Sequence, residues 1–66
     1  AQARGEFERA LEIDPSDDYG HYGVGRCAER QGRLRDAAKH YKLACALADN
    51  PDYHSALRRV LGRLGA

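Results

Sequence analysis

The apolar positions of this chain lie at helical spacing, and their pattern is written twice. A small-aromatic-small stripe recurs at a constant step: Ala3, Phe7 and Ala10, then Ala37, Tyr41 and Ala44. The same step relates Leu11 to Cys45 and Ile13 to Leu47. A fixed period of about 34 residues is typical of stacked helical repeats. Such arrays have no built-in catalytic centre and usually offer a surface that holds another chain.

Turn residues divide the chain into four predicted helices. We expect them from residue 1 to about 13, from 18 to 31, from 34 to 48, and from 53 to 64. Pro15 disfavours a helical residue before it, and Ser16 or Asp17 can cap the second helix. Gly32 tolerates the left-handed turn that ends a helix. The run Asp49-Asn50-Pro51-Asp52 should stop the third helix.

The last predicted helix is amphipathic. Leu57, Val60, Leu61 and Leu64 lie at helical spacing, and the opposite side carries arginines 58, 59 and 63. We expect this segment to close the stack.

Three glycines interrupt the second predicted helix, at positions 20, 23 and 25. Each costs roughly 1 kcal/mol relative to alanine inside a helix, so a close approach of a neighbouring helix should offset at least one of them. Gly25 and Ala28 leave room for the third helix, where a larger side chain would overpack the seam. We expect the aromatics Phe7 and Tyr41 to fill the core beside such small residues.

Composition narrows the function classes. The chain has 66 residues, a formal net charge of +1 and 32% charged residues, which predicts one small folded domain. A basic cluster at Arg30, Arg33, Arg35, Lys39 and Lys42 could neutralise phosphates, but the near-neutral total and the lack of a recognition motif argue against nucleic acid. Acids prevail from residue 6 to 18 and bases from 26 to 42, which would favour ordered stacking.

No residue pattern points to catalysis or to a cofactor. The histidines 21, 40 and 54 lack the i, i+4 spacing of a helical metal pair, and no nucleophile motif or phosphate loop is present, so we expect neither enzyme activity nor a metal. Cys27 and Cys45 are best interpreted as small core residues with free thiols, and a bridge between them or a metal role are the alternatives.

We expect a location in the cytoplasm and no membrane span. No apolar run approaches the roughly 20 residues that a span needs, and the first residues do not resemble a signal peptide. Because the chain contains no Met, we expect it to be a fragment of a longer protein.

The motif residues together resemble the tetratricopeptide repeat family, whose helix-turn-helix unit also spans about 34 residues. The residues that follow the family pattern in order are Val24-Gly25, Ala28, Gly32, Leu34, Ala37, Tyr41 and Ala44, with Phe7, Ala10 and Asp14-Pro15 repeating its ending. Departures are His21 in a place that usually holds a large aromatic or apolar residue, Ala28 in place of a common Tyr, and Pro51, two residues late relative to Pro15.

The resemblance implies an all-α fold of antiparallel helix-turn-helix repeats in a right-handed superhelix of about four helices. Residues 1–15 would be the second helix of one repeat, 18–49 a complete repeat, and 52–66 the first or capping helix of the next. It also implies a concave groove that binds an extended peptide or a helix of a partner protein. Carried onto this chain, the groove residues are Tyr19, Tyr22, Arg26, Glu29 and Arg30.

These residue types suit a protein partner, and an acidic peptide or a free C-terminus is a candidate ligand, because arginine forms bidentate bonds to a carboxylate. The family's Lys and Asn pair for a terminal carboxylate is not visible, which argues against the subclass that binds chaperone tails. The alternative for Arg26, Glu29 and Arg30 is a solvated helix face without a ligand.

Self-assembly is a second function class. The first helix lacks its pairing helix, and Leu57, Leu61 and Leu64 on the last helix could meet a missing neighbour. A homo-oligomer through these terminal helices, or an exchange of helices between two chains, would cover both ends. A ligand groove requires Tyr19, Tyr22 and Arg26 to be exposed, whereas an assembly module would bury them between subunits.

Overall fold

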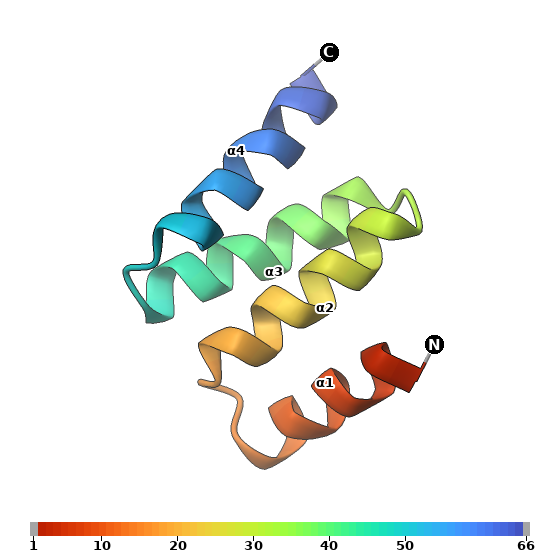
Figure 1. Ribbon diagram of the computed structural model, residues 1–66, viewed down its shortest axis with the longest axis vertical. Helices are drawn as coiled ribbons and strands as arrows, with labels where there is room; N and C mark the ends of the chain where they lie inside the picture. The colour runs from red at the N-terminus through yellow and green to blue at the C-terminus, as the bar shows by residue number, and fades with distance from the viewer. Residues whose placement is uncertain (1, 66) are drawn as a thin grey trace.

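Four helices make up the part of the chain that the computed structural model describes, residues 2–65 with the side chains of 5–65. They are α1 (Gln2–Ile13), α2 (Asp18–Arg30), α3 (Leu34–Leu47) and α4 (Pro51–Gly65) (Figure 1). The predicted all-α fold of about four helices is therefore confirmed. Ala1, Ala66 and the side chain of Ala3, with its predicted packing, lie outside the described residues.

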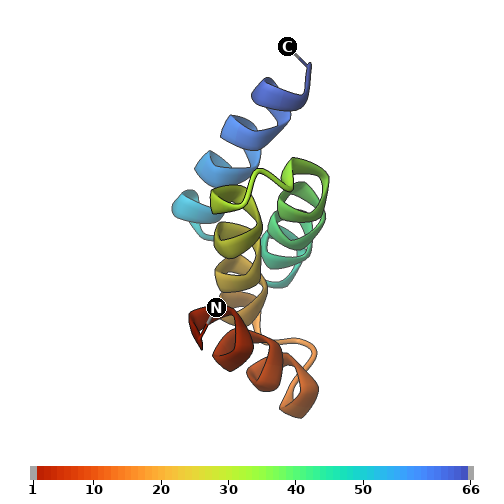
Figure 2. The ribbon, with the colours of Figure 1, turned by 90° about the vertical axis from the view of Figure 1, so that its right-hand side faces the viewer.

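Each helix packs antiparallel against the one before it, in a body of 35 × 26 × 14 Å. The middle helix α2 lies between α1 and α3, and α4 packs on α3 (Figure 1). In the perpendicular view, α2 and α4 lie on the same side of α3 (Figure 2). Helices α2 and α4 therefore form one face of the molecule.

The connections follow from local chemistry. Of the two predicted candidates, Ser16 and Asp17, it is Asp17 that caps α2: its side chain accepts a hydrogen bond from the Gly20 amide at 3.2 Å. Gly32 ends α2 with a φ of 78°, while its own amide donates to Glu29 and the next amide donates to Ala28. This pattern satisfies the last carbonyls of the helix and needs a left-handed residue at position 32.

The step between two helices, meaning the sequence distance between their equivalent residues, is one residue shorter from α2 to α4 than from α1 to α3. The cause is the connection between α3 and α4, which is one residue shorter than that between α1 and α2. Asn50 therefore takes the place of Asp17, and its side chain accepts from the Asp52 amide at 2.8 Å. Pro51 is the first residue of α4, a position where its missing N–H costs nothing. The predicted start at residue 53 was two residues late for this reason.

Aromatic rings pack on glycines at both seams of α2. A Cβ at Gly25 would come within 2.7 Å of the Tyr41 ring, and a Cβ at Gly23 would overlap the Phe7 ring. Tyr41 and Val60 are the largest fully buried side chains, and Ala28, Ala37 and other small residues complete the core. The predicted close approach is confirmed, and it occurs on two sides of one helix.

Candidate partner-binding site

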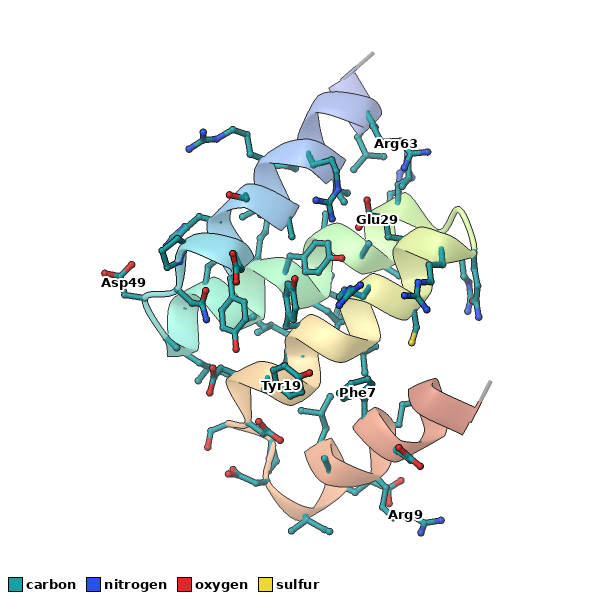
Figure 3. The ribbon with its side chains drawn as sticks, viewed as in Figure 1. Phe7, Arg9, Tyr19, Glu29, Asp49 and Arg63 are labelled. Atoms are coloured by element: carbon teal, nitrogen blue, oxygen red, sulfur yellow. The ribbon has the colours of Figure 1, made fainter. Side chains whose placement is uncertain are left out.

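Four of the five predicted groove residues line one cavity between α1 and α2. It has a volume of about 170 Å³ and is lined by Phe7, Tyr19, Tyr22, Gly23, Arg26, Cys27 and Arg30. Because Gly23 has no side chain, the Phe7 ring reaches the α2 backbone and forms the floor beside Tyr19 (Figure 3). The fifth predicted residue, Glu29, does not line this cavity.

A chain of aromatic rings crosses this face. The Tyr19 ring meets the Phe7 ring edge-on, with centroids 5.7 Å apart, and remains 59% exposed. Tyr22 is half-buried and lies 4.8 Å from the Tyr53 ring and 5.7 Å from the Tyr41 ring. Tyr22 is thereby held rigid on one side, while Tyr19 offers apolar area and a hydroxyl to solvent.

The two cationic residues of the cavity are exposed and lack an acidic partner among the described residues. The Arg26 guanidinium lies 5.8 Å from the centre of the Tyr22 ring, in the range of a cation–π contact. Neither Arg26 nor Arg30 lies within ion-pair distance of a carboxylate in residues 5–65. Their donors remain available to an acidic ligand in solution.

Glu29 instead joins α2 to α4. Its side chain is only 14% exposed and accepts two hydrogen bonds from Arg59, each 2.7 Å long. The Tyr41 hydroxyl donates a third at 2.8 Å, and the Arg63 guanidinium is 3.9 Å away. The bonds from Arg59 hold the pKa of the Glu29 carboxyl below its usual range. Its oxygens are committed within the fold, so Glu29 supports the face and is not open to a ligand.

A further hydrogen bond joins the same two helices near their N-termini. The Tyr53 hydroxyl donates to the Asp18 carboxylate at 2.7 Å. Burial, followed by this contact, raises the pKa of Tyr53 to about 12. The α2–α4 face is thus fixed at both ends by polar contacts, to Glu29 at one end and to Asp18 at the other.

Three participants in this face were not predicted from the sequence, namely Tyr53, Arg59 and Arg63. A signal for two of them is present in the sequence, because the shorter step from α2 to α4 relates Arg26 to Arg59 and Arg30 to Arg63. The longer step from α1 to α3 hides this relation. The capping residues Asp17 and Asn50 would have revealed the shorter step.

Three further properties of the described residues concern metal ligands, thiols and membrane spans. Residues 5–65 bring together no group of three or more potential metal ligands among His, Cys, Asp and Glu. Cys27 and Cys45 are free and half-buried, and burial raises the pKa of the Cys45 thiol. None of the four helices is both long and apolar enough to cross a membrane.

Comparison with known proteins gives one family. A family model described as "Tetratricopeptide repeat" matches residues 1–60. The "Cytochrome c-type biogenesis protein CycH" of Bradyrhizobium diazoefficiens is 39% identical over 67 aligned residues, which is 98% of this chain and 18% of that protein. The chain therefore spans less than a fifth of the length of this relative. No solved structure matches the chain.

Proposed function

The chain belongs to the tetratricopeptide repeat family of protein–protein interaction modules, and we propose that it binds an acidic segment of a partner protein at the cavity between α1 and α2. The observation that carries this proposal is the pair Arg26 and Arg30, exposed beside aromatic rings and without acidic partners in residues 5–65. Carboxylates of the ligand would meet the two guanidinium groups, which suit bidentate bonds.

An apolar side chain of the same ligand would enter the cavity against Phe7 and Tyr19. Its volume of about 170 Å³ suits one side chain and not a whole small molecule, because small-molecule pockets usually exceed about 300 Å³. We therefore propose an acidic segment that carries an aliphatic or aromatic residue next to its carboxylates. Glu29 has a supporting part in this proposal, since it fixes α2 against α4.

The repeat boundaries stay part of the proposal. We assign residues 18–49 to a complete repeat, 1–15 to the second helix of the preceding repeat, and 52–66 to a capping helix. The step from α2 to α4 places Arg58 where α2 has Gly25. An arginine there would prevent another helix from packing as closely as α3 packs on α2, which supports a cap. A location in the cytoplasm likewise stays a prediction.

A peptide selection tests the proposed site. Random peptides would be selected from a display library on the wild-type chain, and the affinity of the enriched sequences measured by fluorescence anisotropy. We expect acidic sequences with one large apolar residue, and binding that weakens as the salt concentration rises.

Two charge-matched variants locate the binding. Arg26→Glu with Arg30→Glu changes the cavity, while Arg9→Glu with Lys42→Glu makes the same total change of charge on exposed positions of α1 and α3. The Arg9 side chain points away from the cavity (Figure 3). We expect binding to fall at least tenfold in the first variant and little in the second. Equal losses in both would mean that net charge, and not this site, controls binding.

Self-assembly is the second candidate, and one surface feature favours it. A hollow of about 550 Å³ on α4 is lined by His54, Leu57, Arg58, Leu61 and Gly62, with Leu61 42% exposed. Light scattering over a concentration series separates the candidates. A monomer at all concentrations would exclude assembly, whereas a dimer that Leu61→Glu converts to a monomer would support it.

A further inference from the structure

Two histidines meet edge to edge at the seam between α2 and α3. His21 is only 9% exposed, and its Nδ1 lies 3.2 Å from the Nδ1 of the half-buried His40. The ring centroids are 5.4 Å apart with an interplanar angle of 27°, so the two nitrogens lie between rings that share nearly one plane. This is the geometry of an N–H···N hydrogen bond between imidazoles.

The surroundings fix which nitrogen carries each proton in the neutral pair. The His21 Nε2 lies 2.9 Å from the Pro15 carbonyl oxygen, which can only accept, so the proton of His21 is on Nε2. The Nδ1 of a neutral His21 must then accept. His40 therefore donates from its own Nδ1, and its Nε2 is left without a proton.

Acid changes this contact in two steps. The first proton binds to the Nε2 of His40. One N–H and one lone pair then remain between the two Nδ1 atoms, so the hydrogen bond persists and its donor ring is positively charged. A second proton leaves N–H groups on both sides and two positive rings in contact. No acceptor remains between the two Nδ1 atoms, and like charges in a half-buried site repel strongly.

Charged groups from the neighbouring elements only partly oppose this repulsion. Glu8 of α1 and Asp36 of α3 favour a charged His40, whereas Lys39 of α3 and His21 of α2 disfavour it. Arg33, in the connection between α2 and α3, lines the same hollow of about 240 Å³ as His40, Glu8 and Asp36. Burial is the largest influence, and the pKa of His40 lies below its usual value.

We propose that the His21–His40 contact is an acid-sensitive joint, which holds α2 on α3 while it carries at most one proton and opens when both rings are charged. In the unfolded chain the His40 ring takes up its proton near a pH of about 6.5. Because the folded pKa of His40 is depressed, the stability from this contact is present above that pH and is lost as the pH falls. His21 precedes Tyr22 in α2 and His40 precedes Tyr41 in α3, so an opening of the joint would disturb the aromatic contact between Tyr22 and Tyr41.

The test has two readouts. Long-range proton–nitrogen spectra of the wild-type imidazoles at pH 8 should show His21 protonated on Nε2 and His40 on Nδ1. Urea unfolding between pH 8 and pH 5 should show the unfolding constant rising by up to about tenfold per pH unit at the steepest point, since one more proton binds to the unfolded chain.

Three variants isolate the pair. His21→Phe removes the joint and leaves two histidines, and His54→Gln is the matched control because it removes an exposed histidine that faces Asp49 at 3.3 Å. His40→Asn places an amide at the contact, which can turn either its N–H or its oxygen toward His21. We expect the acid dependence to be reduced both in His21→Phe, where burial still acts on His40, and in His40→Asn, and to be kept in His54→Gln.

The opposite results overturn the proposal. An unfolding constant with the same pH dependence in wild type, His21→Phe and His54→Gln would mean that the pair is no joint. A neutral His40 with its proton on Nε2 would break the hydrogen-bond assignment, and this spectrum of the wild-type chain decides the matter even if His21→Phe does not fold.

Discussion

Replacing Gly25 by Ala tests the account of the α2–α3 seam. The new Cβ would lie 2.7 Å from the Tyr41 ring, closer than carbon atoms pack. Tyr41 has no room to move, because it is fully buried and its hydroxyl donates to Glu29 at 2.8 Å. Overpacking of this kind costs about 1–3 kcal/mol, whereas the gain in helix propensity over glycine is about 1 kcal/mol. The difference of these two figures gives a net loss of about 0–2 kcal/mol.

Gly62→Ala is the control for this experiment. Gly62 is also helical, and apart from its own helical backbone and its two chain neighbours, no described atom lies within 4 Å of the position of its Cβ. Only the propensity gain applies there, so the stability should rise by up to about 1 kcal/mol. The assay is urea unfolding followed by circular dichroism for both variants. If Gly25→Ala were as stabilising as Gly62→Ala, the packing of Tyr41 on the glycine would be refuted.

Three further substitutions test the polar contacts that order the helices. Tyr53→Phe removes the hydrogen bond to Asp18 and should cost about 1 kcal/mol of unfolding free energy. In the wild type, the absorbance of the Tyr53 phenolate should appear only at a pH of about 12, because the pKa of Tyr53 is raised to that value. The stability that this contact contributes should be lost as the pH rises through about 12. Glu29→Gln should cost about 1 kcal/mol, since Arg59 is half exposed and part of the attraction is screened. The pKa of Glu29 is lower in the folded chain than its ordinary value of 4.5. The stability that Glu29 contributes is therefore present above a pH of 4.5 and is lost as the pH falls through the folded pKa. The unfolding free energies of wild type and Glu29→Gln should become equal at low pH. Asp17→Ala removes the cap of α2 and should lower the unfolding midpoint by an amount equivalent to about 0.5–2 kcal/mol.

The sequence predicted the fold closely where the signals were local. Apolar spacing indicated the four helices, and Gly32 and Asp17 marked the ends of α2 as the structure has them. The start of α4 was misplaced because Pro51 was taken as a helix stop. A proline can equally be the first residue of a helix, and only the cap at Asn50 distinguishes the two cases.

The candidate site was less predictable, because it depends on contacts across helices. The family pattern pointed to one face of α2, but it could not indicate that Arg59 on α4 would engage Glu29, 30 residues earlier in the chain. The sequence also does not indicate that Phe7 of α1 lines the cavity, because Phe7 reaches that position only by packing on Gly23 of α2. The His21–His40 contact has no sequence signal, since the two rings are brought together only by the register of α2 on α3.

The most direct test of the proposed function is to map a bound acidic peptide by amide chemical shifts. The chain would be labelled with nitrogen-15 and titrated with the tightest peptide from the selection. We predict shift changes concentrated at Tyr19, Tyr22, Arg26 and Arg30, with Phe7 in the same cluster. Changes centred instead on Leu57 and Leu61 of α4, with this cavity unaffected, would contradict the proposed site.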